Sequence, residues 1–159
     1  MGAVVSITIS IVDRLLPLAN KAGEYFGLLG IRLLLAYEFG EAGAEKLRGS
    51  NWFAHVKDDF PFPLNTVPVQ ISWFFATWFE LIGAVALVVG LFTRFFALSL
   101  AVLTAVAWMS VHASHGYNVC QNGYKLPLIF LVMLIPLILS GPGRLALDRY
   151  IWERVRPGR

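Results

Sequence analysis

The chain has 159 residues, of which 57% are hydrophobic and only 14% are charged, and its mean hydropathy is +0.66. Soluble domains carry about a quarter of their residues as charged side chains, so this composition is typical of a membrane protein. The single cysteine, Cys120, excludes an intramolecular disulfide and a Cys-x-x-Cys thiol enzyme. The net charge of +3 does not indicate nucleic-acid binding, because the Lys and Arg residues fall mostly at the ends of apolar stretches.

The first fifteen or so residues are apolar around Asp13 and Arg14. This segment is too short to cross a bilayer, and it has neither the basic start nor the cleavage site of a signal peptide. Its apolar residues are Ile7, Ile9, Ile11, Leu15 and Leu16. The pattern predicts a separate helix that lies on the membrane surface.

Four later stretches approach the roughly 20 apolar residues that a membrane-spanning helix needs. They cover approximately residues 22–44, 69–91, 95–114 and 124–140. We therefore expect an all-α fold, an integral membrane four-helix bundle that forms one domain over residues 1–159. The N-terminal surface helix precedes this bundle.

The connection between the first two spanning stretches, residues 48–70, is the only long one. It begins with Asn51-Trp52-Phe53 and continues with Pro61, Pro63 and Pro68. This order predicts a short interfacial helix followed by an extended proline-rich stretch, which we expect to cover the outer end of the bundle.

The basic residues divide unequally between the two ends of the predicted bundle. One end has Arg14, Lys21, Arg94, Arg144, Arg149, Arg154, Arg156 and Arg159, and the other has Lys46, Arg48, Lys57 and Lys125. The end richer in Lys and Arg normally faces the cytoplasm, so we expect a bacterial inner-membrane protein with both termini inside. The basic C-terminal run is expected to contact anionic lipid head groups.

Arg32 and Glu80 are charged residues near the middle of two spanning stretches. Each charge at the bilayer centre costs at least about 2.5 to 3.5 kcal/mol, and their matched depth in antiparallel helices predicts that they pair. Small residues, Ala76, Thr77, Gly83 and Ala84, share the face of Glu80 and allow close helix packing. The pair is either a structural ion pair or part of a site coupled to protons or electrons.

Glu38, Glu41 and Glu45 follow one face of the first spanning helix, while His112 and His115 are three residues apart at the outer end of the third. Carboxylates and imidazoles from facing helices can hold a transition metal, so Glu38, Glu41, His112 and His115 are the candidate ligands. A quinone head group is the other candidate ligand, with Arg32, Glu80, Glu38, His112 and Trp108 as its candidate contacts. The alternative is that the outer Glu and His side chains are simply solvated.

Four motifs resemble a known family. They are Gly43-Ala44-Glu45-Lys46-Leu47, the run from Glu80-Leu81-Ile82-Gly83 to Gly90-Leu91-Phe92-Thr93-Arg94, His112, and Gly141-Pro142-Gly143-Arg144-Leu145-Ala146-Leu147-Asp148. In order and spacing they resemble the DoxX proteins, small four-helix bacterial membrane proteins related to the quinone-linked subunit of thiosulfate:quinone oxidoreductase. The resemblance covers about residues 27 to 150, and it implies an association with redox chemistry without identifying a substrate.

Two functions remain open. The first is a membrane subunit of an oxidoreductase that binds a quinone or a metal ion near the periplasmic face. The second is a non-catalytic anchor or assembly protein that docks a partner at the outer loop or the basic tail. For the second, residues 60–68 resemble the loop of DoxX relatives found beside enzymes that mature metal-binding peptides. Transport is disfavoured, because few polar residues lie below Arg32 and Glu80.

Overall fold

The computed structural model describes residues 2–155, with side chains for residues 13–155. Every regular element in this range is helical, which confirms the predicted all-α class. The five α-helices are α1 (Gly2–Arg48), α2 (Val69–Val89), α3 (Thr93–Ala107), α4 (Lys125–Ser140) and α5 (Leu147–Val155).

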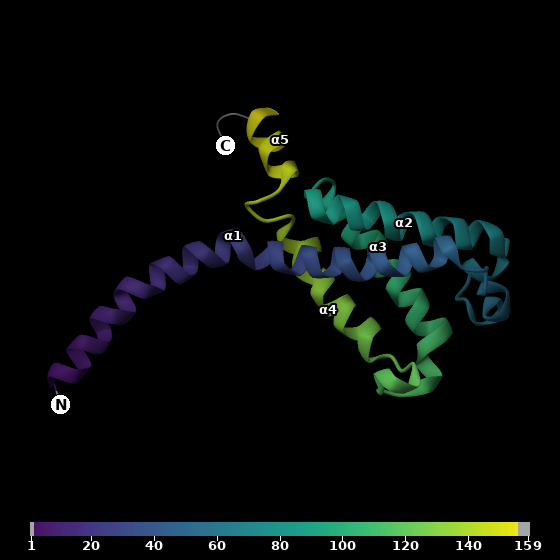
Figure 1. Ribbon diagram of the computed structural model, residues 1–159, viewed down its shortest axis with the longest axis horizontal. Helices are drawn as coiled ribbons and strands as arrows, with labels where there is room; N and C mark the ends of the chain where they lie inside the picture. The colour runs from purple at the N-terminus through teal and green to yellow at the C-terminus, as the bar shows by residue number, and fades with distance from the viewer. Residues whose placement is uncertain (1, 156–159) are drawn as a thin grey trace.

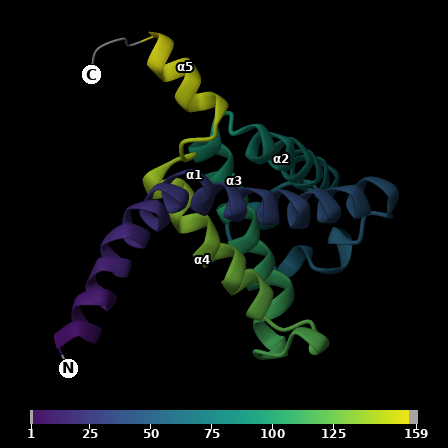
Figure 2. The same cartoon turned by 60° about the vertical axis from the view of Figure 1, so that its left-hand side comes forward.

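The helices pack as two crossing pairs (Figures 1 and 2). The C-terminal half of α1 runs beside α2, while α3 runs beside α4, and α2 also contacts α3. Leucine side chains that are fully buried where the pairs meet form the centre of the core: Leu35, Leu87, Leu100, Leu134 and Leu137. Apolar packing at the crossing therefore holds the four long helices together.

Among the described residues, two segments are long and apolar enough to cross a membrane, Val69–Val89 and Thr93–His115. The fourth predicted span, α4, is equally apolar but has 16 residues. The first predicted span lies within α1 and carries Arg32 and several glutamates. Length and composition thus support two of the four predicted membrane crossings directly.

The predicted separation of a surface helix from the first spanning helix is wrong, because α1 is one continuous helix of 47 residues. Pro17 removes one backbone hydrogen bond but does not end the helix, and α1 curves away from the other helices in its N-terminal half (Figure 1). The side chains of Ile7, Ile9 and Ile11 lie outside the described residues, as do Arg156 and Arg159.

The outer loop also differs from the prediction. A short helix followed by an extended stretch was expected, whereas the structure has three single turns of 3-10 helix: η1 (Phe53–His55), η2 (Lys57–Asp59) and η3 (Leu64–Thr66). An edge-to-face contact holds the loop on the start of α2, because the ring centroids of Phe53 and Trp73 are 5.0 Å apart. Within the loop, the ring centroid of Phe53 lies 5.3 Å from that of the buried Phe60. The prolines interrupt helical hydrogen bonding, and the helical segments of the loop are therefore limited to single turns.

The third spanning stretch changes geometry at its outer end. After α3, the chain continues as a π-helix, η4 (Trp108–His112), and then as a 3-10 turn, η5 (Ala113–His115). The outer-loop turn η2 packs against η4, so the loop contacts the outer end of this helix.

Candidate functional site

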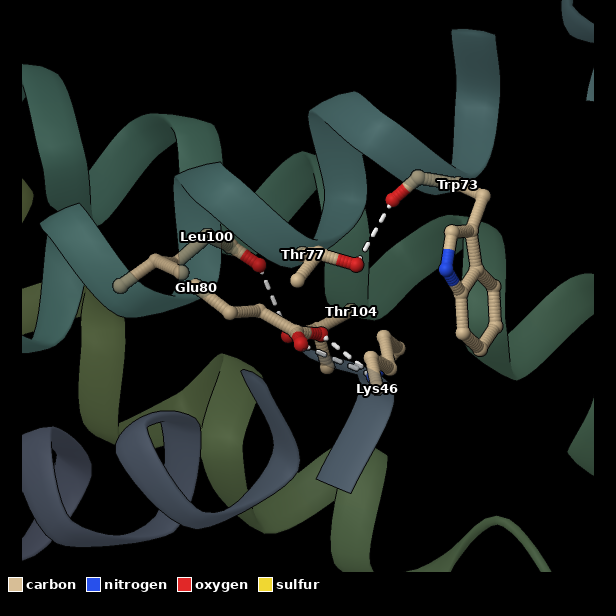
Figure 3. Close-up of polar contacts among 6 residues, drawn as sticks. All are labelled: Lys46, Trp73, Thr77, Glu80, Leu100 and Thr104. Atoms are coloured by element: carbon tan, nitrogen blue, oxygen red, sulfur yellow. Dashed lines mark hydrogen bonds and ion pairs between the residues drawn. The ribbon is translucent and has the colours of Figure 1, made fainter. Parts of the chain in front are cut away.

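The buried charges of the helix bundle form two clusters, one towards each end. In the outer cluster, Lys46 from α1 contacts Glu80 from α2, with Nζ 2.8 Å from Oε2 and 3.0 Å from Oε1 (Figure 3). The exposed fractions of the two side chains are 15% and 11%. The bidentate contact matches the charges of two otherwise costly side chains within an apolar interface.

Threonine hydroxyls lie around this ion pair without bonding to it (Figure 3). Thr77 donates to the carbonyl of Trp73 at 2.8 Å, and Thr104 donates to the carbonyl of Leu100 at 2.7 Å. Each hydroxyl thus donates its hydrogen bond to a backbone carbonyl in the preceding turn of its own helix. Lys46 is therefore the partner that compensates the Glu80 carboxylate.

Gly43 explains how α1 comes close enough to α2 for this pairing. A Cβ at Gly43 would lie 2.9 Å from Leu81 Cγ and 3.2 Å from Glu80 Cβ, which leaves no room for a side chain. The predicted small-residue face of α2 is confirmed as buried: Ala76, Thr77, Gly83 and Ala84. Close backbone approach places Lys46, one turn after Gly43, beside Glu80.

The second cluster is at the opposite end of the bundle and centres on Arg32, which is 1% exposed. Its guanidinium donates to the carbonyls of Leu87 at 2.8 Å and Val88 at 3.0 Å, and to those of Pro142 at 2.7 Å and Leu145 at 2.9 Å. The first two carbonyls belong to the last turn of α2, which has no helical partner for them. Arg32 therefore joins α1, α2 and the turn before α5.

Gly90 and Asp148 complete this cluster, which we call the inner junction: Arg32, Gly90 and Asp148 with the carbonyls that Arg32 contacts. Gly90 ends α2 with φ of +72°, and a Cβ there would lie 2.9 Å from Arg32 Nη1. Asp148 accepts hydrogen bonds from the backbone N–H groups of Phe92 at 2.8 Å and Thr93 at 2.9 Å. A carboxylate at the start of α3 satisfies N–H groups that lack helical acceptors.

The predicted pair of Arg32 with Glu80 is wrong, because each residue has a different partner. Arg32 lies opposite the last turn of α2, whereas Glu80 lies opposite Gly43. The depth estimate failed because it took residue 22 as the inner end of the first helix, while α1 continues without a break to Gly2. Lys46 was missed as the partner of Glu80, although both residues belong to the motifs that resemble the DoxX family.

The outer Glu and His residues do not form a metal cluster. Within the part of the chain whose side chains are described, no three His, Cys, Asp or Glu residues come together in a way that could hold a metal ion. Glu41 is exposed and Glu38 is half-buried. His115 contacts the hydroxyl of Ser114 at 3.2 Å.

His112 has a defined environment of its own. Its Nδ1 lies 2.7 Å from the carbonyl oxygen of Asn122, and a carbonyl can only accept, so Nδ1 carries the proton and neutral His112 presents Nε2 as an acceptor. Trp108, at the other end of the same π-helix, stacks on Tyr124 with a centroid distance of 5.4 Å and an interplanar angle of 12°. Short π-helical segments occur frequently at functional sites.

The Lys46–Glu80 pair predicts a specific pattern of stabilities. Replacing either residue by Ala leaves an uncompensated buried charge, so Glu80→Ala and Lys46→Ala should each destabilise the protein by about 3 to 5 kcal/mol. The double variant Lys46→Met/Glu80→Leu should be destabilised less, because no charge remains. Unfolding by SDS titration in mixed micelles measures this, with the exposed Glu41→Ala as the control. A double variant as unstable as the sum of the two single variants would contradict the pairing.

The inner junction predicts that lysine cannot replace Arg32. An ammonium group lacks the planar fork that reaches four carbonyls, and each buried carbonyl left without a donor costs about 1 to 3 kcal/mol. Arg32→Lys should therefore destabilise the protein by about 2 kcal/mol or more in the same titration. Arg14→Lys, at an exposed position on the same helix, is the matched control. Equal stability of the two variants would show that the junction does not need a guanidinium.

Comparison with known proteins identifies the family. Residues 27–113 match the DoxX family, and this range contains α2, α3, Lys46 and Glu80. An uncharacterized protein of Haemophilus influenzae is 54% identical over 135 residues, which cover 85% of this chain and 89% of that protein. A second uncharacterized protein of the same organism is 32% identical over 78 residues, covering 47% of this chain and 58% of its own length. No solved structure is significantly similar. The chain therefore belongs to the DoxX family of membrane proteins.

Proposed function

We propose that the chain is a non-catalytic subunit of the bacterial inner membrane that anchors or helps to assemble a protein partner. One observation carries this proposal: charged side chains in the family motifs bind other parts of the same chain. Lys46 binds Glu80, and Asp148 binds the start of α3. Arg32, which is buried, binds four carbonyls. These side chains hold helices in place, which is what a scaffold requires.

A catalytic role would need reactive groups that a substrate can reach. Glu80 and Lys46 are mostly buried and neutralise each other. The hydrogen bonds of Arg32 are directed to backbone oxygens. The candidate metal ligands do not form a cluster among the described side chains. These observations favour the anchoring function over the oxidoreductase function.

The outer loop is the surface that we propose for the partner. Its aromatic contacts fix it on α2, and beside it lies an open hollow of about 600 Å³ whose lining includes Asn51, Thr66 and Gln70. A fixed surface of mixed polar and apolar side chains suits recognition of a protein or peptide. The resemblance of residues 60–68 to relatives beside enzymes that mature metal-binding peptides favours a partner from such a system.

A second candidate function is binding of a quinol head group, and His112 is the observation in its favour. Because Nδ1 donates to Asn122, Nε2 is available to accept a hydrogen bond from a quinol hydroxyl. The stacked rings of Trp108 and Tyr124 belong to the same outer region and could contact an aromatic head group.

Titration of the purified protein with a short-chain quinol separates the two functions. The anchoring function predicts no saturable binding, no change in the visible spectrum and no stoichiometric transition metal in elemental analysis. Saturable quinol binding that His112→Gln removes, while the exposed His115→Gln retains it, would overturn the anchoring proposal in favour of the quinol site. Stability of both variants is measured in parallel, so that loss of folding is recognised.

The charge distribution gives a prediction for topology. With the basic end inside, a periplasm-dependent reporter such as an exported phosphatase should be inactive when fused after Arg159 and active when fused in the outer loop after Thr66. The reverse pattern of activities would place both termini outside.

A further inference from the structure

An open hollow of about 1120 Å³ lies at the inner end of the bundle, between α5 and the start of α3. Three arginines contribute to its wall: Arg94 from α3, Arg144 from the turn before α5, and Arg149 from α5. Apolar side chains complete the wall, and the largest are Phe92, Phe95 and Trp152. Three carboxylates, Glu24, Asp148 and Glu153, also line the hollow, which thus combines three arginines and three acidic residues with an apolar rim.

The arginines retain hydrogen-bonding capacity. A guanidinium has five N–H donors, and Arg94 gives one to the carbonyl of Leu139 while Arg149 gives one to Glu153. Arg144 pairs with Glu24 at 2.8 Å, but these side chains remain 39% and 51% exposed, so the pair is weak. Asp148, the third acidic side chain of the wall, is occupied by the backbone of Phe92 and Thr93.

An apolar stripe leads from the hollow along the outside of α3. Phe95, Leu98 and Val102 recur at intervals of three and four residues and are each about half exposed. On a helix apolar enough to span a membrane, such a stripe can contact acyl chains. A molecule with an anionic head and apolar tails could thus contact both the arginines and the stripe.

The adjoining helices have the character of surface helices. On α5, Leu147, Tyr150, Ile151 and Val155 recur at spacings of three and four and are between 38% and 70% exposed. In both views α5 leaves the end of the bundle at a steep angle to α2, close to where the N-terminal half of α1 leaves it (Figures 1 and 2). In that half of α1, Leu15 and Leu18 are exposed, and Arg14, Leu18 and Lys21 follow one another at intervals of four and three residues along one face. The one-sided apolar pattern of α5 suits the interface between lipid head groups and acyl chains.

We propose that the inner hollow binds the phosphate of an anionic phospholipid, with α5 lying along the membrane surface beside it. Arg94, Arg144 and Arg149 bind the phosphate, and the lipid tails follow Phe95 and Leu98 along α3. The occupant is a lipid of the surrounding bilayer because the anion site opens onto an apolar, exposed helix face. This inference rests on the proposed embedding of the helices in the membrane.

Native mass spectrometry of the full chain tests the proposal. The protein is released from mixed micelles containing equal amounts of phosphatidylglycerol and phosphatidylcholine, and the retained lipids are counted. The wild type should retain more phosphatidylglycerol than phosphatidylcholine. Arg144→Gln/Arg149→Gln should lower this preference by about fivefold for each lost charge, the usual contribution of one basic residue near an anionic surface. Arg48→Gln/Lys125→Gln, which removes two charges at the outer end, should leave the preference unchanged.

Each other outcome overturns the lipid site. Equal retention of the two lipids by the wild type shows that no anionic site exists, and an equal loss in the outer-end variant shows that only net charge matters. Displacement of the retained lipid by inorganic phosphate identifies a site for free anions instead. Carbonate extraction of membranes is carried out first. A chain released by carbonate contradicts the proposed embedding itself, whereas a retained chain without lipid preference contradicts only the lipid site.

Discussion

The arrangement of the bundle depends on how one buried guanidinium is satisfied. Arg32 is almost completely inaccessible, and four backbone carbonyls surround it. The last turn of α2 illustrates the result, since the carbonyl of Ala86 accepts from Gly90 and Leu91, while the next two carbonyls accept from Arg32. These three backbone oxygens at the end of α2 thus have protein donors. The same side chain fixes the positions of α1 and α5 relative to that end.

The two polar clusters solve the same problem in different ways. At the outer end, a lysine and a glutamate neutralise each other across the closely packed α1 and α2. At the inner end, an arginine binds carbonyl oxygens and an aspartate binds N–H groups, so each charge meets helix ends of opposite polarity. The apolar core lies between these clusters, with Leu87 and Leu100 fully buried. Polar contacts at both ends therefore set the register of helices whose apolar packing alone is not directional.

Much of the fold follows from local sequence, and the errors share a cause. The apolar runs predicted α2 and α4 to within two residues at each end, and the small residues around Glu80 predicted its buried face. The pairing of charges could not be predicted, because it depends on how far α1 slides along α2, and hydropathy does not record that register. The first helix was also predicted as two separate helices, whereas α1 continues through Pro17, because a curved helix tolerates the lost hydrogen bond. At the outer end, the identities of Glu38 and His112 suggested a shared site, but spacing along two helices does not determine whether their side chains meet.

The route of the chain through the inner junction has a consequence for the order of assembly. Two acceptors of Arg32 and the cap of α3 come from residues 142–148, beyond all four long helices. A growing chain that contains only α1, α2 and α3 has a guanidinium with half of its acceptors and a start of α3 without its carboxylate. The inner junction is therefore completed only when the segment between α4 and the start of α5 has been synthesised.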